Sequence, residues 1–357
     1  MMDIQSVIVY LGLAVLCFFV AKFAERTNSK KAVWFIVFAL SLIAGLRALS
    51  VGIDSNTYDR WFDLIANGHQ KRIYGVEASF MFICSLALAV WNNTNFLFLL
   101  FALLTHGLVI FSFWKNREHI SFRWAVFSYY IMFFTFSLNG VRQFAAVALV
   151  IYATNYIREG KYLRFLLTIM AAAMFHLSAL VGCVYLLYEI LFLKTFDRKR
   201  RVILIIVSAV VGSLGISLTG YLLNNYSGYF DRQATSAGIM MFVKIAMLIL
   251  SVVIIGIPKD KKDRRIYGMF AVFYGLGIIL NSLSYMFLYM GRIGLYFYVY
   301  EGFFVGRVFK EKNRTIWILL LKLGYGLLLL YFLYDLIVSN RQGHLPYRFI
   351  WQLKEFY

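Results

Sequence analysis

Long apolar runs recur along the whole sequence and restrict its fold more than any other feature. They extend from Ile4 to Val338, and the typical run has roughly fifteen to twenty-four residues. A bilayer core of about 30 Å is crossed by about 20 helical residues. The runs lack the polar and apolar alternation of barrel strands, and 62% of all residues are hydrophobic, too many for a water-soluble domain of 357 residues. The sequence therefore predicts an all-α integral membrane protein.

The net charge of +19 indicates membrane orientation rather than a nucleic-acid partner, because the basic residues lie in short segments between apolar runs. Six clusters hold 24 of the 36 lysines and arginines: residues 22–31, 115–123, 158–164, 194–201, 258–265 and 307–314. By the positive-inside tendency all six are expected on the cytoplasmic side. The first run, Ile4 to Val20, has no basic leader or small-residue cleavage site and is predicted to be a retained helix.

A segment between two cytoplasmic clusters must cross the membrane an even number of times. This condition predicts four helical hairpins: residues 124–157, 165–193, 202–257 and 266–308. Polar residues near their centres are expected to mark the turns: Asn139 and Arg142, His176, the loop 224–238, and Arg292. Arg142 would then lie at the outer mouth of a hairpin rather than in mid-bilayer, where it would cost about 2.5–3.5 kcal/mol.

The apolar run from Glu77 to Trp91 is short and polar at both ends, so we expect a re-entrant or interfacial helix there. The run from Phe96 to Trp114 then returns to the cytoplasm. The total becomes about twelve transmembrane helices in a single polytopic domain, residues 1–357, with both termini outside. No internal repeat is visible.

This topology gathers polar side chains from six or seven segments on the outer face, where they predict a cavity. Arg47, Arg142 and Arg292 each lie where a helix reaches that face, and guanidinium groups bind phosphate in bidentate fashion. Snorkelling or helix capping would explain any one of them equally well. Three together favour an anionic ligand.

A general base in such a cavity must come from the carboxylates in this region or from His176. His176 is as readily explained as a structural histidine. The carboxylates are Asp54, Asp59, Asp63 and Glu77. For Asp59 and Asp63 we prefer pairing with the nearby arginines, Arg47, Arg60 and Arg72. Several tyrosines could stack on the rings of a ligand, although each alone also fits an aromatic belt: Tyr58, Tyr226, Tyr229, Tyr296 and Tyr347.

Four charged residues lie within apolar runs, where each needs a partner or an interface: Glu189, Lys244, Glu301 and Lys322. They keep a transporter as an alternative. The three cysteines are scattered singly, and no phosphate-binding loop, dinucleotide fingerprint or zinc motif occurs. No cofactor and no metal are therefore expected.

Several motifs together resemble the EpsG family of Wzy-like polysaccharide polymerases. In order they are "VGIDSNTYDRWF", "VEASFMFI", "NGVRQFAA", "MFHLSALV", "GRIGLYF" and "LPYRFIW", from about Arg47 to Tyr347. The "RQ" element followed by "FH" is the most specific part. The chain has Ala78 where the family commonly has proline after the glutamate.

The resemblance implies a multi-pass glycosyltransferase of GT-C-like architecture in the bacterial plasma membrane, with its active site facing the periplasm or exterior. Its substrates would be oligosaccharide repeat units on undecaprenyl diphosphate, used to build an O-antigen, a capsule or an exopolysaccharide. The growing glycan would move from its lipid diphosphate to a second lipid-linked unit. Besides membrane lipids, a chain-length regulator and a flippase are partners to consider; nucleic acid is not.

Site roles follow from combining the resemblance with the residues. Arg142 and Arg292 would hold the donor diphosphate with help from Arg47, and Asp54 or His176 would take the acceptor's proton, with Glu77 as another candidate. The remaining substrate-binding candidates are Tyr58, Asn139, Gln143 and Tyr296. A flippase of lipid-linked oligosaccharide is the main alternative. A membrane acyltransferase is a third, for which His176 would face the wrong side.

Overall fold

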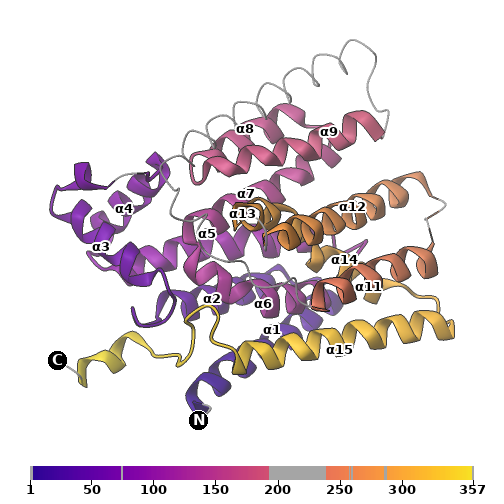
Figure 1. Ribbon diagram of the computed structural model, residues 1–357, viewed down its shortest axis with the longest axis horizontal. Coiled ribbons are helices and arrows are strands. Elements are labelled where there is room, and N and C mark those ends of the chain that lie inside the picture. The colour runs from indigo at the N-terminus through magenta and orange to yellow at the C-terminus, as the bar shows by residue number, and fades with distance from the viewer. Residues whose placement is uncertain are drawn as a thin grey trace.

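The computed structural model describes residues 3–73, 75–192, 239–256, 258, 260–284 and 288–355, and these are largely helical. No β-strand occurs in these ranges, where one isolated antiparallel bridge joins Arg47 to Phe349. Most helices run alongside one another, and the two ends of the chain lie on the same side of the bundle (Figure 1). The all-α class is thus confirmed.

The α-helices of the described ranges are α1 (Ile4–Thr27), α2 (Lys30–Gly45), α3 (Ser55–Ala66), α4 (Ala78–Val90), α5 (Thr94–Lys115), α6 (Phe122–Asn139), α7 (Val141–Arg158), α8 (Tyr162–Ala173), α9 (Cys183–Phe192), α11 (Ile239–Ile255), α12 (Lys261–Leu283), α13 (Leu288–Tyr298), α14 (Tyr300–Lys310) and α15 (Ile316–Val338). Short 3-10 helices are η1 (Gln70–Arg72), η2 (Leu177–Gly182) and η4 (Ile350–Glu355).

Four helices are long and apolar enough to cross a bilayer: Ile4–Thr27, Thr94–Lys115, Asp263–Leu283 and Ile316–Val338. Shorter apolar helices accompany them, among them α4, α8 and α11. α15 leaves Trp317, Leu320 and Leu327 exposed, an apolar face that is stable against lipid but not against water. The chain is therefore a multi-pass membrane protein.

Five of the six basic clusters meet at one end of the bundle, as the topology requires. Side chains and carbonyls of different clusters contact one another there, through Arg117–Asn28 (3.2 Å), Lys310–Arg117 (3.1 Å), Lys115–Glu159 (3.7 Å) and His119–Asp263 (3.1 Å). The cluster 194–201 and the loop 224–238 lie outside the described residues.

α2 and α5 pack antiparallel, and this restricts how often residues 46–93, which connect them, can cross the membrane. A Cβ added at Gly45 would lie 2.8 Å from the Leu99 Cβ, and one at Gly107 would lie 3.8 Å from Val37. The chain thus leaves α2 and enters α5 at the same end. α4, with 13 residues, spans only about 20 Å. The prediction that this run does not cross is supported, whereas α3, amphipathic and 12 residues long, was missed as a helix.

Two of the predicted turns agree with the structure and one was misplaced. α6 ends at Asn139 and α7 begins at Val141, and His176 lies between α8 and η2. Arg292, however, lies inside α13 rather than at a turn, because α12 already ends at Leu283.

The antiparallel packing of α12 and α13 explains why the turn predicted at Arg292 lies earlier in the chain. A Cβ added at Gly291 would lie 2.9 Å from the Ser284 Cβ, and one at Gly294 would lie 2.9 Å from the Asn281 nitrogen. These glycines let the two helices approach closely from the first turns of α13 onward. The return arm is divided into α13 and α14, which are separated only by Val299.

Candidate functional site at the end opposite the basic clusters

Charged and titratable side chains from five segments converge at the end of the bundle opposite the basic clusters. The segments are the loop before α3, the start of α4, the start of α7, the connection between α8 and η2, and α13. They are far apart in sequence, so only the tertiary fold brings their side chains together.

Arg142 and Glu77 form the central ion pair of this region. Arg142, in the first turn of α7, donates through Nη1 to Glu77 Oε2 and to the Gly75 carbonyl at 3.4 Å. Its guanidinium carbon lies 5.1 Å from the ring centroid of Trp61, within the range of a cation–π contact. The buried Nε has no hydrogen-bond partner among the described residues.

Burial raises the pKa of the Glu77 carboxyl, while the positive charge of Arg142 acts in the opposite direction. Glu77 precedes the first residue of α4 but makes no side-chain cap to it. Its main interaction is therefore with Arg142, and we assign it to holding that guanidinium in place.

Asp54 lies within the electrostatic reach of two arginines. Burial raises the pKa of its carboxyl, and the charges of Arg292 and Arg142 partly offset this. Although Asp54 stands just before α3, its side chain makes no capping hydrogen bond. The carboxyl is only partly shielded, since the residue as a whole keeps exposed surface, so it remains accessible as well as close to positive charge.

His176 begins a hydrogen-bond chain that leads to α13. Its Nδ1 lies 2.6 Å from the Ser178 hydroxyl, which in turn lies 3.0 Å from the Tyr296 hydroxyl. Burial lowers the pKa of His176 to about 3, with further lowering by Arg142 and Arg292. The imidazole is thus held neutral at physiological pH, and the buried Tyr296 interacts with the protein rather than with an open cavity.

Arg47 does not join this group, because its guanidinium is engaged in hydrogen bonds to main-chain carbonyls. It is fully buried, with Nη1 donating to the Ala44 carbonyl at 2.5 Å, Nη2 to Leu138 at 2.9 Å and Nε to Val51 at 3.2 Å. Its guanidinium carbon lies 3.9 Å from the Phe98 ring centroid. Arg47 therefore ties α2, the following loop and α6 together.

The other substrate-binding candidates are connected to the group in different ways. Tyr58 is buried beside Arg142, and burial raises the pKa of its hydroxyl. Gln143 donates to the main-chain carbonyl of Arg292 at 2.7 Å. Asn139 donates to the Gln342 carbonyl and to Gln342 Oε1, both at 2.9 Å.

The expected pairing of Asp59 and Asp63 with arginines is wrong for the residues that the structure describes. Asp59 instead accepts a hydrogen bond from the Thr94 hydroxyl. No ion pair within these ranges joins either acid to an arginine. Nor does any group of three or more His, Cys, Asp or Glu side chains within them have the arrangement to hold a metal ion.

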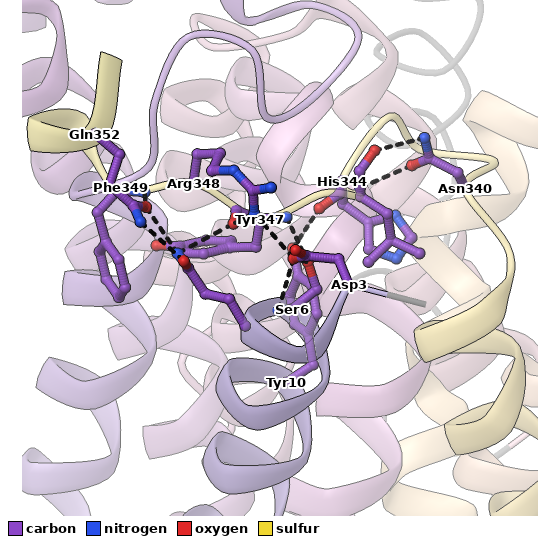
Figure 2. Close-up of polar contacts among 11 residues, drawn as sticks. Asp3, Ser6, Tyr10, Asn340, His344, Tyr347, Arg348, Phe349 and Gln352 are labelled. Carbon is purple, nitrogen blue, oxygen red and sulfur yellow. Dashed lines mark hydrogen bonds and ion pairs between the residues drawn. The ribbon is translucent and has the colours of Figure 1, made fainter. Parts of the chain in front are cut away.

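The C-terminal segment is attached to the start of α1. Figure 2 shows Tyr10 donating to the His344 carbonyl (3.0 Å) and Arg348 to Asp3 (2.9 Å). The backbone nitrogen of Tyr347 donates to the Ser6 hydroxyl at 2.6 Å. Hydrogen bonds from Arg348 and Ser6 lower the pKa of Asp3 to about 2.

The same C-terminal segment also holds the loop that carries Asp54. Backbone hydrogen bonds join Ala48 to Arg348 at 2.8 Å and Gly52 to Gly343 at 2.7 Å. Gln342 then reaches Asn139, whose Oδ1 lies 3.5 Å from the Asp54 backbone nitrogen. Gln342 was not among the site residues predicted from the sequence, although it lies in the tail just before the motif "LPYRFIW".

Three of the four charged residues in apolar runs are in ion pairs. Lys244 and Glu301 are both buried and lie 2.8 Å apart, and Glu189 pairs with Arg265. Lys322 donates to the Glu311 carbonyl at 2.6 Å. The sequence-based requirement for partners is met, and none of these groups lies in the Arg142 region.

A family profile adds an independent finding. The EpsG family matches residues 30–349, most of the chain. The chain belongs to the EpsG family. EpsG-like proteins are Wzy-type polymerases, so membership indicates a membrane polysaccharide polymerase of the glycosyltransferase type. No curated protein and no solved structure gives a significant match. The EpsG match includes α2 to α15 and the first part of the C-terminal segment, and so covers the whole Arg142 region.

Proposed function

We propose that the protein extends a polysaccharide by transferring the growing glycan from undecaprenyl diphosphate to a lipid-linked repeat unit. The observation that carries the proposal is the grouping of Arg142, Arg292, Asp54 and His176 at the end opposite the basic clusters. With those clusters in the cytoplasm, this end faces the outside of the bacterial plasma membrane. A single domain of about twelve crossings with GT-C-like architecture belongs to the same proposal.

In the proposed mechanism, Arg142 and Arg292 bind the donor diphosphate. The acceptor hydroxyl oxygen attacks the anomeric carbon, and the bond between that carbon and the phosphate oxygen breaks. The diphosphate leaves with the electron pair, and both guanidinium groups stabilise its developing charge. The ion pair with Glu77 holds the Arg142 guanidinium in position for this role.

The acceptor proton goes to the Asp54 carboxylate. Burial raises the pKa of Asp54, which makes it a stronger base than an ordinary aspartate, whereas His176, with a pKa of about 3, is a weak one. Glu77 is committed to Arg142. Asp54 therefore fits the role of general base best, and His176 that of a neutral positioning group.

The direct test replaces Arg142 with Ala in cells whose own polymerase gene is deleted. Chain extension should stop, and single repeat units on the lipid carrier should accumulate on the outer face at normal protein level. Arg341, whose side chain is 76% exposed, provides the matched control, and Arg341→Ala should leave chain length unchanged. Normal chain lengths in the Arg142→Ala strain would remove Arg142 from the mechanism. Failure of the wild-type gene to restore polymer in the deleted cells would reject the proposed function.

A flippase is the alternative that the buried Lys244–Glu301 pair favours, because transporters use charged groups within the membrane. The two functions differ in where intermediates accumulate. Loss of a flippase keeps lipid-linked repeat units inside, whereas loss of a polymerase leaves them outside as single units. Surface labelling of the accumulated glycan in the Arg142→Ala strain separates these outcomes.

A further inference from the structure

A cavity of about 410 Å³ lies beside the Arg142 region and has no role in the mechanism above. It is lined by Asn56, Thr57, Arg60, Trp61, Leu64 and Arg72. The first five lie on one face of α3, because helical residues three or four positions apart share a face. Arg72, from η1, completes the lining. The volume of the cavity falls within the range of about 300–1,000 Å³ typical of small-molecule sites.

The charges of the lining point to an anion. Arg60 and Arg72 are exposed, and within the described ranges neither side chain makes a hydrogen bond or ion pair. The lining contains no carboxylate, and the nearby Asp59 is hydrogen-bonded to Thr94. Two guanidinium groups on a site without counter-charge favour a carboxylate or phosphate, which each can bind with two parallel hydrogen bonds.

Trp61 and the polar side chains point to a sugar as the carrier of that anion. An indole ring provides a broad apolar surface for a sugar ring, while Asn56 and Thr57 can hydrogen-bond to its hydroxyls. Trp61 also contacts the Arg142 guanidinium at 5.1 Å from the ring centroid. It therefore forms a wall between the cavity and the proposed diphosphate site, and one glycan could extend from one to the other.

We propose that this cavity binds a carboxylate-bearing sugar of the repeat unit, so that the protein selects an acidic glycan. The inference rests on the proposed function for the identity of the glycan, but its test involves binding alone and no transfer step. The acidic-sugar site can therefore be rejected while the polymerase function stands, and the reverse.

The experiment uses the full-length protein in phosphatidylcholine nanodiscs and measures binding of a tetrasaccharide containing glucuronic acid. The probe for comparison is the corresponding neutral glucose tetrasaccharide. We expect the acidic probe to bind roughly tenfold tighter or more, and to weaken as salt is raised. The double variant Arg60→Gln/Arg72→Gln should lose this preference. Lys71→Gln is the matched control, because Lys71 is exposed next to Arg72 but does not line the cavity.

Three results would overturn the inference: equal affinity for the two probes, an unchanged preference in the double variant, or displacement of the acidic probe by an equal concentration of inorganic phosphate. The last would indicate a bare anion site rather than a sugar site. An unchanged melting temperature for the double variant shows that lost binding is not lost folding. Failure of the wild-type gene to restore polymer in the deleted cells, together with an intact preference, would reject the polymerase and leave an acidic-glycan site.

Discussion

The side-chain amide of Gln143 donates a 2.7 Å hydrogen bond to the main-chain carbonyl of Arg292. The two residues are 149 positions apart and belong to α7 and α13. Because Arg142 precedes Gln143, this bond relates the positions of the two arginines proposed to bind one diphosphate.

Replacing Gln143 with Leu keeps the volume of the side chain but removes the donor. We expect shorter polymer with a loss of stability of about 1 kcal/mol, as for one hydrogen bond. Chain length on gels and the melting temperature in detergent measure the two effects. Gln70→Leu, in exposed η1, serves as the control. Full-length polymer from the Gln143→Leu variant would show that Arg292 does not depend on this bond.

The Arg142–Glu77 pair predicts a graded response to substitution. Glu77→Ala leaves the guanidinium without its partner and should stop extension, at a cost of about 1.5–3 kcal/mol for a hydrogen bond to a charged group. Glu77→Gln keeps an acceptor oxygen and should retain part of the activity. If Glu77→Gln is as inactive as Glu77→Ala, the carboxylate itself takes part in the reaction and the positioning role is wrong.

The neutral His176 predicts a specific pH dependence of stability. Its pKa falls from 6.5 to about 3 on folding, so the folded state binds this proton less readily than the unfolded state. Stability is therefore complete above pH 6.5 and is lost as the pH falls toward 3, by up to about 1.4 kcal/mol per pH unit. The melting temperature of His176→Gln should depend less on pH in that window. Parallel curves for the two proteins would contradict the burial of a neutral imidazole.

The raised pKa of Asp54 predicts that activity is lost on the acid side at a higher pH than usual. Its carboxylate must be deprotonated to take a proton, and burial raises its pKa above the ordinary value of 3.8. Transfer should therefore decline at a higher pH than an exposed aspartate would allow. Asp54→Asn should be inactive at every pH, and Asp54→Glu should restore some transfer. An active Asp54→Asn variant would remove Asp54 from the role of base.

The sequence predicted the all-α class, the common end of the five described basic clusters and the convergence of distant polar segments, because these follow from hydrophobicity and charge alone. It did not predict the position of Arg292, since nothing local shows that Gly291 and Gly294 let α13 begin so soon after α12. Nor could the sequence show that Arg47 is held by main-chain carbonyls whereas Arg142 lies in the candidate site. Both follow apolar helices, but only the fold surrounds Arg47 with the carbonyls of Ala44, Val51 and Leu138.

The buried pair of Lys244 and Glu301 gives a prediction that separates a structural role from transport. Lys244 lies 2.8 Å from Glu301 and also contacts Tyr298. Lys244→Met alone would leave Glu301 charged and buried, at a cost of about 3–5 kcal/mol. The double variant Lys244→Met/Glu301→Gln removes both charges and should recover most of the lost protein level and full-length polymer. A double variant that is stable but makes no polymer would instead show that the charges themselves are required, as in a transporter. Recovery of polymer is the expected result, because the two groups neutralise each other within the bundle, away from the Arg142 region.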